Sequence, residues 1–274
     1  MLIEGQPGDC IPALDRGLQF GDGLFETIAV RAGHPLLLND HLARLRAGAQ
    51  RLHIDPPVSD DELGREIAAQ AGDLERGIVK LIVTRGAGGR GYAPPADPSA
   101  TRIVSAHRWP DGVLEKQRVG VRVGLSPLRL GAQPVLAGIK HLNRLEQVLA
   151  RTRMPREWDE ALMRDHADNL VEATAANLFL VMDDRICTPP LAECGVAGVI
   201  RGRLLDGSLA TSGLPVFEQP LAEDDLRRAR EVFLTNCVIG LWPVTRVDDC
   251  GYAIGPISRA LQTQLHEKNL AILD

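Results

Sequence analysis

Residues 78–95 read IVKLIVTRGAGGRGYAPP, and this stretch decides between two kinds of fold. Three of its glycines have the G-x-G-x-x-G spacing of a dinucleotide-binding turn, and they follow an apolar segment typical of a strand. A dinucleotide site requires a helix that begins at the third glycine, because the helix N-terminus binds the pyrophosphate. Residues 92–98 read YAPPADP instead, and their prolines prevent a helix. The stretch therefore predicts a strand and a flexible loop that presents Arg90 and Tyr92 to an anion, and it excludes a Rossmann fold.

The segments around this loop predict an α+β protein with two domains. The expected domains are a smaller N-terminal one over 1–112 and a larger one over 126–274, with a linker and a first strand over 113–125. The irregular part of the linker is expected over 109–117. Apolar alternation predicts strands at 24–31, 78–84, 101–107, 119–125, 160–163, 170–173, 177–181 and 185–187. Capping residues and helical periodicity predict helices at 40–52, 60–71, from 143 onward, and at 200–210, 222–230 and 256–268.

Composition narrows the class of protein. The 274 residues carry a net charge of −5 and no basic block, which argues against nucleic-acid binding. Five cysteines without a C-x-x-C pair are typical of reduced thiols, so neither a disulfide framework nor a metal site is expected. No signal peptide and no apolar run of about 20 residues is found, so we expect no membrane segment and a cytoplasmic location.

Three side chains are candidates for chemistry. Only four of the 31 basic residues are lysines, and one of them, Lys140, follows an apolar segment at an irregular helix start. A lysine amine can form a Schiff base and a guanidinium cannot, although a surface lysine is the simpler interpretation. Glu172, between apolar neighbours, is either a solvent-facing strand carboxylate or a partner for a pyridinium nitrogen. Arg44, near the apolar face of its helix, needs a phosphate or a carboxylate as partner.

Two backbone segments are weaker candidates for an anion-binding site. Residues 195–201 (GVAGVIR) run from a loop into a helix, where free N–H groups bind anions. Residues 234–238 (LTNCV) end a strand in a polar turn. An amine, a carboxylate, an arginine and two sets of backbone amides are together the parts of a pyridoxal phosphate site.

In their order and their residues, the motifs of this chain closely resemble those of the fold-type IV pyridoxal phosphate enzymes, and the resemblance covers essentially the whole chain. The motifs are, in chain order, FGDGLFE at 20–26, HLARL at 41–45, Lys140, and EATAANLF at 172–179. That family contains branched-chain and D-amino-acid aminotransferases and aminodeoxychorismate lyases. Two segments, RGAGGRGY at 85–92 and LAGIKHLNRLEQ at 136–147, resemble the corresponding sequences of the lyases.

The resemblance implies a role for each matching residue. Lys140 matches the lysine that forms the Schiff base with the cofactor, Glu172 the carboxylate at the pyridine nitrogen, and Arg44 the arginine at the phosphate. The remaining matches are Val199 and Ile200 as phosphate-binding amides, Asn236 and Cys237 as a second phosphate turn, and Arg90, Tyr92 and Phe25 as substrate-binding residues. No tyrosine follows Lys140 closely, so the contact to the phenolic oxygen of the cofactor is unassigned.

The implied function is elimination of pyruvate from 4-amino-4-deoxychorismate, giving 4-aminobenzoate for folate synthesis, by a homodimer. An aminotransferase acting on D-amino or branched-chain amino acids is the first alternative, since it uses the same lysine, carboxylate and phosphate groups. A non-catalytic protein that binds a small anion is the alternative from another class.

Overall fold

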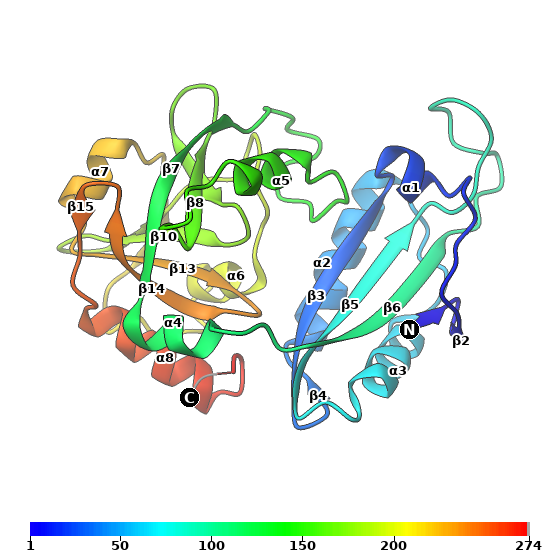
Figure 1. The fold of residues 1–274 in the computed structure, drawn as a ribbon, viewed down its shortest axis with the longest axis horizontal. Coiled ribbons are helices and arrows are strands. Elements are labelled where there is room, and N and C mark those ends of the chain that lie inside the picture. Colours follow the sequence, from blue (N-terminus) through cyan, green and yellow to red (C-terminus); the bar gives the residue numbers. More distant parts are fainter. Residues whose placement is uncertain (273–274) are drawn as a thin grey trace. The chain divides into compact units, whose positions relative to one another are not determined.

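The structure, a computed structural model, describes residues 1–272 and contains two compact units (Figure 1). The first comprises Met1–Pro110 and Ile139–Asn143. The second comprises Asp111–Gly138 and the described chain from Arg144 onward. The sequence predicts a boundary near residue 112 with residues 139–143 in the second domain, whereas the contacts of that segment group it with the first unit.

The first unit is an antiparallel sheet in the order β2-β1-β6-β5-β3-β4, with helices packed on it. Its strands are β1 (Leu2–Ile3), β2 (Gln6–Pro7), β3 (Gly23–Arg31), β4 (His34–Pro35), β5 (Arg76–Thr84) and β6 (Thr101–Arg108). Its helices are α1 (Arg16–Phe20), α2 (Leu38–Leu52) and α3 (Asp60–Ala71). The predicted strands at 24–31, 78–84 and 101–107 and the predicted helices at 40–52 and 60–71 are confirmed within a few residues.

Alternation along β3 and β5 gives this sheet two different faces. Leu24 and Ile28 of β3 pack with Leu45 of α2 and Ile67 of α3 in one buried apolar core. Successive strand residues point to opposite faces, so Phe25 lies on the face away from this core. Figure 1 shows α2 and α3 on the same side of the sheet. The sheet therefore has a helix-covered face and an open face.

The second unit is built around a closed ring of strands. β10 pairs with β13, β13 with β14, β14 with β7, β7 with β8, β8 with β9, and β9 again with β10, which forms a six-stranded barrel. Phe179 and Phe233, on two of these strands, are fully buried and stack with their ring centroids 5.0 Å apart. Its strands are β7 (Val121–Arg129), β8 (Glu160–Arg164), β9 (Leu170–Ala173), β10 (Asn177–Val181), β11 (Ile186–Thr188), β12 (Val216–Glu218), β13 (Glu231–Asn236), β14 (Gly240–Val247) and β15 (Cys250–Gly251).

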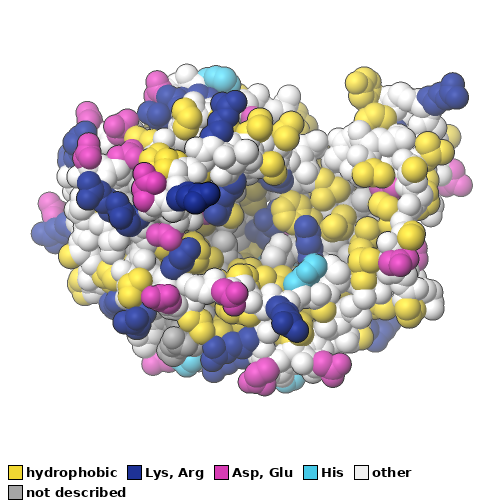
Figure 2. Space-filling model, in the orientation of Figure 1, with side chains coloured by type: hydrophobic (Ala, Val, Ile, Leu, Met, Phe, Trp, Pro, Cys, Tyr) yellow, Lys and Arg dark blue, Asp and Glu magenta, His cyan; other side chains and the backbone are white. Residues whose placement is uncertain are grey.

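Charged side chains of both signs are mixed on the surface of the second unit. On the face shown in Figure 2, lysine and arginine side chains lie among aspartates and glutamates rather than in a separate basic patch. On this face the distribution agrees with the scattered charges of the sequence.

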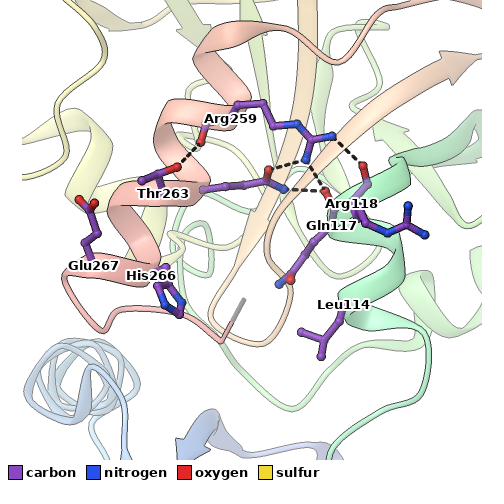
Figure 3. Close-up of a pocket in the computed structure, with 8 residues that line it drawn as sticks. Leu114, Gln117, Arg118, Arg259, Thr263, His266 and Glu267 are labelled. Atoms are coloured by element: carbon purple, nitrogen blue, oxygen red, sulfur yellow. Dashed lines mark hydrogen bonds between the residues drawn. The ribbon is translucent and has the colours of Figure 1, made fainter. Parts of the chain in front are cut away.

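Helices α4 (Val113–Val119), α5 (Leu145–Thr152), α6 (Val199–Leu205), α7 (Glu223–Arg228) and α8 (Pro256–Glu267) complete the second unit. The segment 109–117, predicted as a linker, contains the division between the two units at Pro110–Asp111, but it is not irregular throughout, because α4 begins at Val113 and buries Val113 and Gln117. Arg259 of α8 donates to the carbonyls of Gln117 and Arg118, and Gln262 donates to the Gln117 carbonyl (Figure 3). These bonds satisfy carbonyls in the last turn of α4, which explains why a short polar segment is helical here.

Two other helices differ from their predicted form. α6 ends at Leu205 rather than near 210, since Gly207 adopts a φ of +78° that an α-helix cannot contain. α5 begins at Leu145 as an amphipathic helix, but its apolar residues Leu145 and Val148 are 68% and 55% exposed. In the described part of the chain, no helix is both long enough and apolar enough to cross a membrane.

Candidate active site

Lys140 lies in a short extended segment beside the start of β3. The amide of Phe25 donates to the Lys140 carbonyl at 3.1 Å, and the amide of Leu142 donates to the Gly23 carbonyl at 2.9 Å. The Lys140 Nζ lies 4.3 Å from the centroid of the Phe25 ring, on the open face of the sheet. The fold therefore brings together two predicted site residues that are far apart in the sequence.

A second ammonium group approaches the same ring. Nζ of Lys80, in β5, lies 5.3 Å from the Phe25 centroid. Both distances are within the range of a cation–π contact. Two of the four lysines in the chain thus lie at one aromatic side chain, so position alone does not distinguish the reactive amine from its neighbour.

Arg44 is bound on the helix-covered side of the sheet. Its Nε donates to Oε1 of Glu26 at 2.8 Å, and the Nδ1 atom of His41 lies 2.6 Å from Oε2 of the same carboxylate. Glu26 and His41 are fully buried, and the Arg44 side chain is 15% exposed. A carboxylate partner for Arg44, one of the two possibilities left open by the sequence, is therefore present, and it orients the guanidinium.

Glu26 is a buried carboxylate that stays ionised because of these partners. Burial alone would raise the pKa of Glu26, but the charge and hydrogen bonds of Arg44, together with His41, outweigh it and lower the pKa to about 2. The unfolded chain has a carboxyl with a pKa of about 4.3, so it takes up protons at a higher pH than the folded protein. Glu26 therefore stabilises the fold fully above about pH 5, and this contribution is lost as the pH falls toward 2.

We expect urea unfolding of the protein to show this loss, on the order of 2–3 kcal/mol between pH 6 and pH 2 from Glu26 alone. Glu26→Gln is the matched variant, because it keeps the size of the side chain and removes the titrating group. The free energy of unfolding of the variant should fall less steeply with decreasing pH than that of the parent protein. Parallel curves for the two proteins would show that Glu26 does not carry the effect.

Arg90 and Tyr92 lie in the loop that joins β5 to β6, residues 85–100, here called the Arg90 loop. Both residues are exposed, and Figure 1 shows the loop extending past the ends of the two strands. At Gly86, φ is +87° and a Cβ atom would lie 1.7 Å from the Ser99 carbonyl oxygen. The glycine therefore allows the two arms of the loop to approach each other, and no helix lies between Gly91 and the start of β6.

Glu172, in β9, is buried within the second unit and is 4% exposed. Its Oε2 accepts a hydrogen bond from the amide of Val196 at 2.8 Å, and Nδ2 of Asn177 donates to the Val196 carbonyl at 2.8 Å. The peptide unit around Val196 is thus held from both sides. The solvent-facing alternative for Glu172 is wrong in this unit, and its orientation is coupled to the loop that leads into α6.

Val199 and Ile200, at the start of α6, follow closely after the Val196 peptide that Glu172 and Asn177 hold. Both are buried, and they are the first two residues of the helix, so their N–H groups have no acceptor within the helix. A Cβ atom at Gly198 would lie 2.0 Å from Oδ1 of Asn177, so only glycine fits between the helix and β10. The predicted phosphate-binding amides therefore sit in a rigid backbone segment.

Asn236 and Cys237 form a turn between β13 and β14. Oδ1 of Asn236 accepts from the amides of Val238 and Ile239, both at 2.8 Å, and its Nδ2 donates to the Ala175 carbonyl. The Asn236 side chain thus stabilises the turn itself. A role of this turn in phosphate binding stays a prediction, and it would fall to backbone groups rather than to the Asn236 amide.

Cys194 lies close to Glu172 and is not a nucleophile. Burial, together with the charge of Glu172, raises the pKa of the Cys194 thiol to about 12. The thiol therefore stays protonated at neutral pH, and a thiol is a poor nucleophile in comparison with a thiolate.

The structure groups the candidate residues within each unit. Phe25, Lys140, Arg44, Arg90 and Tyr92 belong to the first unit, and Glu172, Val199, Ile200, Asn236 and Cys237 belong to the second. Three residues that hold other groups in position are missing from the predicted set: Glu26, Asn177, and Arg16, which donates to the carbonyls of Gly91, Tyr92 and Ala93. Glu26 and Asn177 stand inside motifs quoted above, so the motifs contained the signal. Arg16 carries no sequence signal of its own.

Comparison with known proteins identifies the family. The model of the family described as amino-transferase class IV matches residues 23–247, which is most of the chain. The chain belongs to this family, and its fold is that of the fold-type IV pyridoxal phosphate enzymes.

Individual relatives refine this similarity. The chain is 35% identical to the aminodeoxychorismate lyase of Vibrio harveyi over 269 residues, covering 96% of this chain and 98% of that protein. It is 45% identical to the crystal structure of 4-amino-4-deoxychorismate lyase from Pseudomonas aeruginosa, with a TM-score of 0.91 and coverage of 97% and 98%. The branched-chain amino acid aminotransferase from Escherichia coli is 24% identical, with a TM-score of 0.82 and coverage of 96% and 89%. The last similarity shows the fold alone.

Proposed function

We propose that this protein is a 4-amino-4-deoxychorismate lyase that uses pyridoxal 5'-phosphate to release pyruvate and form 4-aminobenzoate, as a step of folate synthesis. The observation that carries the proposal is the 45% identity, over nearly the full length of both chains, to the lyase of known structure. Lys140, Glu172 and Arg44 are all present, which argues against a non-catalytic anion-binding protein.

The residues present fit the cofactor. Pyridoxal phosphate needs an amine, a carboxylate for its ring nitrogen, and donors for its phosphate, and it supplies an electron sink for the carbon next to the substrate amine. Glu172 is a buried carboxylate, and the hydrogen bond that it accepts from the Val196 amide fixes its position. Val199 and Ile200 offer N–H groups at a helix start, and Gly198 allows Asn177 to pack against that start. Arg44, oriented by Glu26, would add a guanidinium to the phosphate.

The protein side chains have defined tasks in the proposed reaction. Lys140, whose amine would hold the cofactor until the substrate amine takes its place, would accept at Nζ the proton of the amine-bearing carbon. The carbon–oxygen bond at the neighbouring carbon breaks, and the enolpyruvyl group leaves as the enolate of pyruvate. Lys140 then returns a proton to that enolate, so no net proton is consumed at Nζ. Arg90 and Tyr92 would bind a carboxylate of the dianionic substrate.

The first test measures lyase and aminotransferase activity side by side. Purified protein with pyridoxal phosphate is added to 4-amino-4-deoxychorismate generated in situ, and 4-aminobenzoate is followed by its fluorescence. D-alanine or L-leucine with 2-oxoglutarate is the parallel transamination assay. We expect fast release of 4-aminobenzoate and slow transamination; fast transamination without release would assign the protein to the aminotransferases of its family.

A homodimer is part of the proposal, and α5 supports it. Leu145, Val148 and Leu149 are 68%, 55% and 39% exposed, although they are the apolar residues of this helix. Contiguous exposed apolar side chains mark interaction surfaces, and a second copy of the chain is the partner that the family resemblance implies. A cytoplasmic location stays a prediction from the sequence.

Sedimentation velocity tests the oligomeric state. The protein should sediment as a species of twice its 29.7 kDa chain mass, and Leu145→Glu should shift it toward the monomer, since a charge would then be buried in an apolar contact. Arg153→Glu, at the C-terminal end of the same helix, is the control for a charge change and should remain dimeric. A monomeric parent protein would contradict the dimer.

A further inference from the structure

We propose that Arg16 is a positioning residue for substrate binding: it holds the Arg90 loop in one conformation, so that Arg90 and Tyr92 are ordered before the substrate arrives. This inference rests on the proposed lyase function for its effect on the substrate, but the contacts of Arg16 stand on their own.

The guanidinium of Arg16 binds three consecutive carbonyls of the loop. Nη2 donates to the Tyr92 carbonyl at 2.8 Å, and Nη1 donates to the carbonyls of Gly91 and Ala93 at 3.2 and 3.3 Å. All three carbonyls directly follow Arg90 in the chain. A single side chain from α1 therefore fixes the backbone on which both predicted substrate residues stand.

Arg16 is itself held in place from several sides. It is 3% exposed, its Nε donates to Oδ2 of Asp22 at 2.9 Å, and its guanidinium lies 4.9 Å from the centroid of the Phe20 ring. The Phe20 ring also contacts the ring of Tyr92, with the centroids 5.5 Å apart. A buried arginine has a fixed geometry, and here that geometry is transmitted to the loop.

The loop contains features that accommodate this side chain. A Cβ atom at Gly88 would lie 2.9 Å from Cδ of Arg16, so a larger residue would displace the arginine stem. Beside Arg90 the backbone is otherwise open, because a Cβ atom at Gly89 or Gly91 would meet nothing within 4 Å. Glycines on both sides of Arg90 make the segment intrinsically flexible, and the bonds from Arg16 counteract that flexibility.

Ordering a loop before binding should act on substrate affinity rather than on the chemical step. Fixing the backbone of a flexible loop costs conformational entropy, and a loop that is already ordered does not incur this cost when the substrate binds. A lysine at position 16 would keep the charge near Asp22 but has no planar fork to span three carbonyls. Loss of the bonds to the loop should therefore raise KM and leave kcat nearly unchanged.

The test compares Arg16→Lys with Arg85→Lys in the holoenzyme. Arg85, the first residue of the Arg90 loop, is the control, because its Nε also lies 2.8 Å from Oδ2 of Asp22, but its bonds to backbone carbonyls go to Leu52 and His53 rather than to residues 91–93. The two readouts are kcat and KM for 4-amino-4-deoxychorismate, and the rate at which trypsin cleaves after Arg90, identified by mass spectrometry of the first products.

We expect Arg16→Lys to raise KM about 10-fold, to change kcat less than about 2-fold, and to accelerate cleavage after Arg90 at least about 5-fold. Arg85→Lys should change neither readout more than about 2-fold. Unchanged cleavage in Arg16→Lys, a fall in kcat without a rise in KM, or equal effects of the two variants would overturn the proposal. The trypsin readout needs no substrate, so a protein without lyase activity would refute the proposed function while leaving the contacts of Arg16 tested.

A second variant covers the case in which Arg16→Lys does not fold. Phe20→Leu keeps Arg16 but removes the ring between the guanidinium and Tyr92. It should raise KM and the rate of cleavage after Arg90 in the same direction, about 2- to 3-fold. If KM and the rate of cleavage after Arg90 were the same in Phe20→Leu as in the parent protein, the proposal would be overturned.

Discussion

Lys140→Ala is expected to reduce the release of 4-aminobenzoate by at least about 1,000-fold, because it removes both the amine that would hold the cofactor and the base for the proton of the substrate. The fold should survive. The hydrogen bond from the Phe25 amide goes to the backbone carbonyl of residue 140, which alanine retains. The contact of Nζ with the Phe25 ring is lost, so the free energy of unfolding should change by less than about 1 kcal/mol.

Lys80→Ala is the control for this variant. The Lys80 ammonium group lies 5.3 Å from the same ring, so its removal makes a comparable change in charge and contact beside Phe25. We expect kcat of Lys80→Ala to stay within a few-fold of the parent value. Reduction with borohydride followed by peptide mapping should find the pyridoxyl group on Lys140 and none on Lys80. An adduct on Lys80, or substantial turnover by Lys140→Ala, would show that Lys140 is not the reactive amine.

The sequence predicted the strands and helices near the candidate residues better than it predicted their environments. Regular alternation at 24–31 and 78–84 depends on local chemistry, and both strands are confirmed. The helix at 113–119 was missed because its stability comes from Arg259 and Gln262, which lie far along the chain and satisfy its last carbonyls. A pattern confined to one segment contains no information on such distant donors.

For the candidate site too, the sequence predicted the residues but not their surroundings. Residue types in recognisable motifs identified Lys140, Glu172 and Arg44, but not what surrounds them. The Glu26 carboxylate that binds Arg44 and the Asn177 amide that holds the Val196 peptide act across separate segments, and only the fold brings these pairs together. Glu172 illustrates the limit most clearly, since one residue between apolar neighbours fits a surface strand as well as the buried position that it occupies.

Glu172→Gln is the second variant with a large expected effect. A glutamine oxygen can still accept the hydrogen bond from the Val196 amide, so the loop leading into α6 should keep its conformation. What the variant removes is the negative charge that would keep the ring nitrogen of the cofactor protonated. Because the electron sink depends on that charge, we expect kcat to fall about 100-fold while the protein still binds pyridoxal phosphate.

Glu160→Gln separates this effect from the general cost of neutralising a buried carboxylate. Glu160 lies in β8, next to β9, is 2% exposed, and binds Arg151 and Thr174. Burial raises the pKa of Glu160 despite these partners. We expect Glu160→Gln to alter the free energy of unfolding more than kcat, and Glu172→Gln to do the reverse.

The contrast between the two variants is decisive because both carboxylates are buried in the same barrel. If Glu172→Gln kept kcat within about 3-fold of the parent value, the ring nitrogen would need no carboxylate here, and Glu172 would serve only to hold the Val196 peptide. Glu172→Ala would then show the larger loss, since it removes the acceptor as well as the charge. The structure leads us to expect a different division: most of the loss in kcat appears already in Glu172→Gln, and Glu172→Ala adds to it only through the freed loop.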